Sequence, residues 1–248
     1  MRKRLFYIGT VLLSLTMILS GCGSQTLTQT DEQSSDLVKP AVQHAPVYKR
    51  TELISSPDAA KQLLIDGNER FIAGKPLSKD LSSTKRMDLM DGQHPFAVIV
   101  SCSDSRVPPE LLFDQALGDL FVIRVAGNVI TPVELGSVEY AVEHLKTPLV
   151  IVLGHEECGA VTAAVQGGEA HGSIAAIISK IKPAANEAKA MGLNGKDLIE
   201  KSVELNTKNA VTDISGSAII KEGVASKKVK ILGAKYDLDE GTLKFNND

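Results

Sequence analysis

The amino-acid sequence predicts an α/β fold in which a mainly parallel β-sheet is flanked by helices. Four short runs rich in apolar and β-branched residues supply the strands, at 96–100, 120–123, 149–153 and 229–232. Runs of this kind suit strands that are covered on both faces, as in parallel sheets. Longer stretches with helical periodicity separate the runs, and this alternation is typical of a parallel α/β sheet.

The composition fits one globular domain with short appendages. Of the 248 residues, 43% are hydrophobic and 23% are charged, which excludes the disordered and fibrous classes of protein. The 27 basic and 30 acidic residues give a net charge of −3, with no dense basic stretch beyond 227–230. We therefore expect no nucleic-acid partner. Three cysteines are too few for a disulfide scaffold, so each is interpreted from its own neighbourhood.

Residues 1–21 are typical of an export signal peptide. A basic start at 2–4 precedes an apolar run at 5–19, which is too short and too rich in Ser and Thr for a membrane span. An uncleaved anchor is the alternative. The small residues before Cys22 resemble the lipobox of bacterial lipoproteins. We therefore expect a lipidated Cys22 that anchors the exported protein to the outer face of the bacterial cytoplasmic membrane or envelope.

Residues 22–50 are expected to form the lipidated cysteine and a flexible tether, and residues 51–248 the folded domain. The tether is rich in Ser, Gln, Thr and Asp and has no helical or strand periodicity. The first helix is expected to begin at Pro57, where Ser56 offers an N-cap and Asp58 an acidic first turn. Its apolar residues recur at helical spacing until Gly74 ends the pattern.

The remainder of the folded domain continues the alternation of helices and strands. Helical periodicity returns from Val133 to Leu145. The stretch beyond Gly167 is less clearly assigned, because Pro183 interrupts a helical pattern. The final segment, 236–245, predicts a strand, a glycine turn and a last strand.

The remaining two cysteines each follow a predicted strand. Cys102 comes directly after the first strand, and His155 and Cys158 come after the third. The carboxyl ends of parallel strands are where open α/β sheets build their sites. Two thiols and one imidazole match Zn²⁺, and three protein ligands leave a fourth tetrahedral position for water or substrate. The sequence therefore predicts a catalytic zinc site rather than a structural one.

Two charged residues after Cys102 extend this site. Asp104 is placed to accept a hydrogen bond from a zinc-bound water, and Arg106 to hold the Asp104 carboxylate by a bidentate pair. The same spacing allows a closed state, in which Asp104 leaves Arg106 and occupies the fourth zinc position itself. An ordinary ion pair is the simpler interpretation of these two residues.

A disulfide is the alternative interpretation of Cys102 and Cys158 in an exported protein. It leaves His155, Asp104 and Arg106 without a shared purpose. The other histidines, His44, His94, His144 and His171, are interpreted as solvated or structural. A proton shuttle at His94 or His171 is the alternative.

Six motifs in one order resemble the β-class carbonic anhydrases, over about 56–245. They are Gln-His-Pro-Phe at 93–96, Cys-Ser-Asp-Ser-Arg-Val-Pro-Pro at 102–109, Arg-Val-Ala-Gly-Asn at 124–128, Glu-Tyr-Ala-Val at 139–142, Gly-His-Glu-Glu-Cys-Gly at 154–159 and Gly-Ala-Lys-Tyr-Asp-Leu at 233–238. The resemblance implies a β-carbonic anhydrase-like catalytic domain with zinc on Cys102, His155 and Cys158. It further implies an Asp104–Arg106 dyad.

The implied reaction is the reversible hydration of carbon dioxide to bicarbonate and a proton by a zinc-bound hydroxide. The implied assembly is a homodimer or tetramer whose sites lie between subunits. Gln93 matches the amide that binds bicarbonate in the family, and Phe121 and Tyr140 match aromatic residues that line the substrate cleft. Two other functions remain open: hydrolysis of carbonyl sulfide or carbon disulfide at the same zinc site, or a catalytically silent zinc-binding surface lipoprotein.

The chain departs from the family in two respects. Some bacterial members hold an inhibitory bicarbonate with a tryptophan, an arginine and a tyrosine, and this chain contains no tryptophan. Bicarbonate inhibition of that kind is therefore in doubt. Most members are also intracellular, whereas this sequence begins with an export signal. Outside the cytosol, bound zinc would protect the thiols from oxidation.

Overall fold

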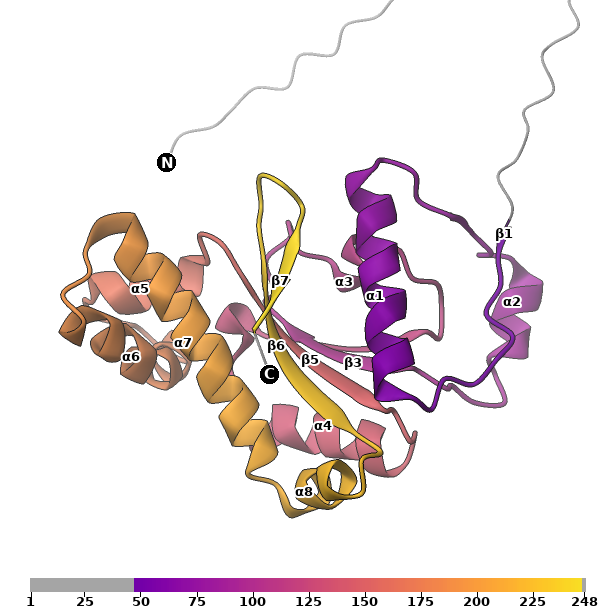
Figure 1. Cartoon of the computed structure of the whole chain (residues 1–248). Coiled ribbons are helices and arrows are strands. Elements are labelled where there is room, and N and C mark those ends of the chain that lie inside the picture. The colour runs from indigo at the N-terminus through magenta and orange to yellow at the C-terminus, as the bar shows by residue number, and fades with distance from the viewer. Residues whose placement is uncertain (1–46, 247–248) are drawn as a thin grey trace, which may run out of the picture. The chain divides into compact units, whose positions relative to one another are not determined.

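A five-stranded sheet forms the centre of the protein in the computed structural model, which describes residues 47–246 (Figure 1). Its strand order is β4-β3-β5-β6-β7, and the first four strands are parallel. The strands are β3 (Ala97–Ser101), β4 (Leu120–Arg124), β5 (Leu149–His155), β6 (Lys230–Tyr236) and the antiparallel β7 (Leu243–Phe245). The predicted α/β architecture with a mainly parallel sheet is therefore confirmed.

Eight α-helices and one 3₁₀ helix occur in the described part of the chain. They are α1 (Pro57–Ile72), α2 (Ser83–Asp88), α3 (Pro109–Leu112), the 3₁₀ helix η1 (Ala126–Asn128), α4 (Pro132–Glu143), α5 (Gly159–Gln166), α6 (Ile174–Ala190), α7 (Gly195–Ser215) and α8 (Ala218–Ala225). Figure 1 shows α5, α6 and α7 grouped together and α4 beside α8. A separate pair of short parallel strands joins β1 (Val47–Tyr48) to β2 (Ser78–Lys79).

The helix boundaries follow from local capping. In α1 the Ser56 hydroxyl accepts a hydrogen bond from the Ala59 amide, and Pro57 occupies the first turn. In α4 the Thr131 amide donates to the Glu134 carboxylate, which forms a capping box. Both helices therefore begin where side chains satisfy the free amides of the first turn.

Two hydrophobic clusters cover the two faces of the sheet. Ala97 and Ile99 of β3 belong to the cluster that contains residues of α1, α5 and α6. Val98 and Val100 belong to the cluster that contains residues of α4 and α8. Successive strand residues point to opposite faces, so a strand buried on both sides is apolar throughout. This explains why β3 and β5 are continuous apolar runs in the sequence.

The structure corrects two boundaries in the second half of the chain. Helix α6 continues through Pro183, whose missing amide would have bonded the carbonyl of Ser179, an exposed residue where water can replace the donor. Strand β6 continues to Tyr236 through Gly233. A Cβ atom on Gly233 would lie 2.6 Å from Asn246 Nδ2, so the glycine marks close packing and not a break in the strand.

The expected signal peptide at 1–21, the lipidated Cys22 and most of the tether to residue 50 lie outside the described residues. At the start of the described chain, Val47 and Tyr48 already form β1, and Arg50 Nε lies 2.7 Å from Asp119 Oδ1. The contacts of the folded domain thus begin before residue 51. Among residues 47–246, no helix is long and apolar enough to cross a membrane.

Asp114 joins the end of α3 to two separate segments. Its buried carboxylate accepts hydrogen bonds from Arg70 Nε at 2.5 Å, from the Leu77 amide at 3.2 Å and from Lys79 Nζ. Burial acts to raise the pKa of Asp114, but the hydrogen bonds from Lys79, Arg70 and Leu77 outweigh it and leave the pKa below its ordinary value. The charged form is therefore the stabilised one.

We expect Asp114→Asn to lower the free energy of unfolding at pH 7 by about 3 kcal/mol, because it leaves two cations without their partner. The stabilisation by Asp114 is complete above the unfolded pKa of about 3.9 and is lost as the pH falls through the lower folded value. Urea denaturation at pH 7 and at about pH 3 should therefore give a smaller difference from wild type in acid. The exposed Asp88→Asn is the control; an equal effect of both variants would contradict the prediction.

Candidate metal centre

The candidate site lies where the chain changes direction across the sheet. From β3 the chain moves to β4 on one side, and from β5 it moves to β6 on the other side. Connections that leave neighbouring parallel strands in opposite directions open a crevice at the carboxyl ends of those strands. Cys102 follows β3 directly, and His155 is the last residue of β5. Residues far apart in sequence thus meet in one crevice.

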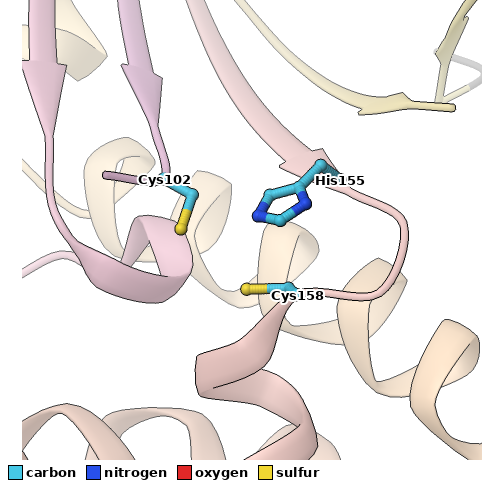
Figure 2. Close-up of side chains that lie close together, drawn as sticks. All are labelled: Cys102, His155 and Cys158. Atoms are coloured by element: carbon cyan, nitrogen blue, oxygen red, sulfur yellow. The ribbon is translucent and has the colours of Figure 1, made fainter. Parts of the chain in front are cut away.

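Three side chains converge in this crevice (Figure 2). Cys102, His155 and Cys158 are buried, and their ligand atoms all lie within 4.8 Å of one another. Cys158 takes the N-cap position of α5 with an extended backbone, so its sulfur lies at the start of that helix. The structure therefore brings together the three residues that the sequence suggested as zinc ligands. Both cysteines are free thiols rather than a disulfide.

The imidazole of His155 is oriented by its own loop. His155 Nδ1 lies 2.8 Å from the Glu156 carbonyl oxygen, to which it can only donate. In the neutral ring, this leaves Nε2 unprotonated, and Nε2 is buried without a hydrogen-bond partner. A metal ion would satisfy a buried acceptor of this kind, and a metal-binding histidine usually donates its other ring N–H to a carbonyl or carboxylate, as His155 Nδ1 does here.

The close approach of the Cys102 and Cys158 thiols favours binding of a cation between their sulfur atoms. The hydrogen bond from Cys158 is the main cause of a Cys102 pKa well below its ordinary value. The pKa of Cys158 is raised by its bond to Cys102, by burial and by the neighbouring negative charge. Both sulfur atoms can therefore be thiolates together only if a positive charge is shared between them. Two thiolates and one imidazole form a donor set that suits Zn²⁺, so the residues present fit this metal.

Asp104 and Arg106 form a bidentate pair beside the three ligands. Arg106 Nε lies 3.0 Å from Asp104 Oδ1, and Nη2 lies 2.8 Å from Oδ2. The hydrogen bonds from the Arg106 side chain and amide hold the pKa of Asp104 at about 2, so the carboxylate stays ionised. Asp104 Oδ2 lies 4.0 Å from His155 Nε2. Of the two states considered from the sequence, the structure shows the one in which Asp104 is paired with Arg106.

Sequence reasoning missed the roles of Arg124 and Asn206, which act together with Gly127 of the motif at 124–128 to hold the Cys102–Asp104 segment. Arg124, at the end of β4, donates from Nε to the Cys102 carbonyl at 3.1 Å and from Nη2 to the Asp104 carbonyl at 2.6 Å. The Gly127 amide donates to Cys102 Sγ at 3.3 Å, and Asn206 Nδ2 donates to the Gly127 carbonyl. Arg124 and Gly127 belong to the motif at 124–128, which was a signal for both. No local pattern marks Asn206.

The three expected substrate-binding residues do not reach this site within one chain. Gln93 precedes β3 and Cys102 follows it, so about 16 Å of strand lies between them. Phe121 pairs with Val98 near the other end of β3, and its ring lies 6.2 Å from that of Tyr140. Tyr140 is 49% exposed. These side chains thus lie at the amino end of the strands, whereas the ligands lie at the carboxyl end.

Among residues 47–246, the remaining histidines lie apart from the ligands, whereas His44 falls outside the described residues. His94 and His144 line a pocket of about 390 Å³ together with Gln93, at the amino end of β3. His144 also contacts Tyr140, with 5.2 Å between the ring centroids. His171 is exposed in the loop between α5 and α6.

Known proteins with similar sequences point to the same family that the motifs suggested. A family model described as carbonic anhydrase matches residues 97–243. The carbonic anhydrase of Mycolicibacterium smegmatis is 40% identical over 197 residues, which cover 78% of this chain and 95% of the relative. Carbonic anhydrase 2 of Mycobacterium tuberculosis is 41% identical over 191 residues, which cover 75% of this chain and 91% of the relative.

Solved structures extend the similarity to the fold. A tetrameric β-carbonic anhydrase of Sordaria macrospora is 26% identical with a TM-score of 0.61, over 66% of this chain and 86% of that one. The Coccomyxa β-carbonic anhydrase, solved in complex with acetazolamide, is 32% identical with a TM-score of 0.59, over 66% of this chain and 77% of that one. The chain therefore belongs to the β-carbonic anhydrase family.

Proposed function

We propose that this carbonic anhydrase hydrates carbon dioxide reversibly, to bicarbonate and a proton, with zinc held by Cys102, His155 and Cys158. The convergence of these three buried side chains beside the Asp104–Arg106 pair is the observation that carries the proposal. A zinc ion bound there would acidify a water molecule and so supply the nucleophile. Family membership supports the reaction, and the orphan Nε2 of His155 supports the metal.

The residues around the metal would orient the reacting water. Asp104 offers a carboxylate oxygen that can accept a hydrogen bond from that water, because Arg106 keeps the group ionised and fixed. Arg106 Nη2 also lies 3.5 Å from the Glu157 carbonyl oxygen. Arg106 thereby connects the Asp104 segment to the loop that carries His155 and Cys158. An oriented acceptor reduces the reorganisation needed when the water attacks carbon dioxide.

A second copy of the chain would complete the substrate cleft. Gln93, Phe121 and Tyr140 lie at the amino end of the strands, so they can line a site only if it belongs to a partner subunit. The 49% exposure of Tyr140 leaves its ring available for such a contact. We therefore propose a homodimer, or a tetramer of the kind known for the Sordaria macrospora protein. In it, the partner supplies an apolar wall for carbon dioxide and an amide for bicarbonate.

We also propose that Cys22 carries a lipid that anchors the enzyme to the outer face of the bacterial cytoplasmic membrane or envelope. The basic start, the apolar run and the small residues before Cys22 support this location. Lipidation would place bicarbonate and proton production at the membrane surface.

One experiment distinguishes the role of the metal ligands from that of the Asp104–Arg106 pair. We expect Cys102→Ser and His155→Ala to lose zinc and activity together, because each removes a ligand. Asp104→Ala should keep zinc and lose turnover by about 10²-fold or more, because only the acceptor for the water is removed. Metal analysis and stopped-flow hydration of carbon dioxide measure the two effects, and Cys22→Ser is the control cysteine. Normal turnover in Asp104→Ala would refute the role of the dyad.

Mixed oligomers test whether Gln93 acts across the interface. Co-expression of Cys102→Ser with Gln93→Ala should restore activity above that of either variant alone, because one site then combines intact ligands with the partner's intact Gln93. Co-expression of Cys102→Ser with Asp104→Ala should restore none, because both changes fall on the ligand side of the site. Differently tagged subunits allow the mixed species to be purified. Equal activity of the two mixtures would show that Gln93 does not act between subunits.

The lipid anchor predicts a mass difference. The full-length protein expressed in a bacterium that processes lipoproteins should lose residues 1–21 and gain acyl groups at Cys22, which intact-protein mass spectrometry detects. Cys22→Ser should remain unacylated and leave the membrane fraction. A wild-type chain that keeps residues 1–21, or carries no lipid, would exclude this mode of anchoring.

A further inference from the structure

Gly127 lies directly against one of the proposed metal ligands. Its amide donates a hydrogen bond to Cys102 Sγ at 3.3 Å, and both residues are buried. Its φ of 71° belongs to the left-handed region that favours glycine. A Cβ atom at this position would lie 2.6 Å from Ile181 Cδ1 and 3.2 Å from Ala160 Cβ. The sulfur therefore receives its hydrogen bond from a closely packed backbone segment whose conformation favours glycine.

Asn206 holds the same glycine from the opposite side. Asn206 lies on α7, is 3% exposed, and donates from Nδ2 to the Gly127 carbonyl oxygen at 2.7 Å. Gly127 is thus fixed at both of its polar groups: its N–H bonds the Cys102 sulfur and its C=O accepts from Asn206. The two bonds connect α7 to the metal site through a single residue.

Removal of the Asn206 amide would leave the Gly127 carbonyl without its hydrogen-bond donor. A buried carbonyl that loses its donor is destabilised, and it can regain a partner if its peptide rotates. Glycine has more backbone freedom than other residues, so such a rotation is easy at Gly127. The C=O and the N–H of Gly127 lie in two successive peptides that share the Gly127 Cα, so a shift of this Cα towards a new partner for the carbonyl would lengthen the bond from the N–H to Cys102 Sγ.

We propose that Asn206 is a positioning residue for the metal centre, which holds the Gly127 N–H on the Cys102 sulfur. This inference rests on the proposed zinc site. A hydrogen bond to a thiolate fixes the direction of the sulfur and disperses part of its negative charge. Groups that orient metal ligands in this way typically change metal affinity or activity 10- to 100-fold when mutated. Asn206 acts on the Cys102 sulfur through Gly127.

Zinc release measures this role without reference to activity. We expect the zinc-loaded Asn206→Ala oligomer to release zinc to excess chelator about 10- to 100-fold faster than wild type. Ser202→Ala is the matched control, because Ser202 is buried one turn earlier on α7 and its hydroxyl bonds only the Leu198 carbonyl. Its release rate should stay within about twofold of wild type. In the cobalt-substituted protein, the thiolate-to-cobalt absorption band should shift in Asn206→Ala and not in Ser202→Ala.

A second variant separates positioning from folding. Asn206→Leu keeps roughly the size of the side chain but has no donor for the Gly127 carbonyl, so it should show the same faster release and the same spectral shift. If Asn206→Ala fails to fold, this second variant tests the positioning role of Asn206 in its place. Wild-type release and an unchanged cobalt band would overturn the proposal, even if the melting temperature of the metal-free variant falls. A wild-type protein that retains no zinc would overturn the proposed metal site and this inference with it.

Discussion

The parallel pairing of β3 with β5 is the constraint on which the candidate metal site depends. In this register Ser101 lies opposite Leu153, so Cys102 and His155 leave the sheet side by side. The chain departs from the two strands in opposite directions, which keeps the space between their ends open. Cys158 then enters that space at the start of α5. Because both strands are buried on both faces, the packing of the core fixes the positions of the ligands.

Hydrogen bonds from separate elements then refine those positions. Arg124 on β4 holds the carbonyls of Cys102 and Asp104, and Gly127 in η1 holds the Cys102 sulfur. Arg106 holds the Asp104 carboxylate. The site is therefore made by several elements that meet, and each is held by the hydrophobic clusters beneath it. Such a rigid arrangement suits a reaction on a small substrate that offers few groups for binding.

Much of this organisation could be predicted from local patterns. The apolar runs gave the parallel strands because burial on both faces leaves no polar alternation. Ser56 and Pro57 placed the start of α1, because capping is a short-range interaction. The residues after β3 and β5 indicated a metal site because carboxyl ends of parallel strands meet at one edge. The path of α6 through Pro183 was not predictable, since packing of Ile181, Ala184 and Ala185 overrides the local signal.

The sequence by itself determined the strand pattern, the ligand types and their attachment to strand ends, because these depend on residue chemistry and short-range periodicity. Only the tertiary structure decided that Tyr140 lies beside Phe121 at the amino end of the strands, because the position of α4 against the sheet depends on packing. It alone also placed Asn206 on Gly127, across 79 residues of sequence. Contacts of that range arise from helix packing on the sheet, which no local pattern encodes.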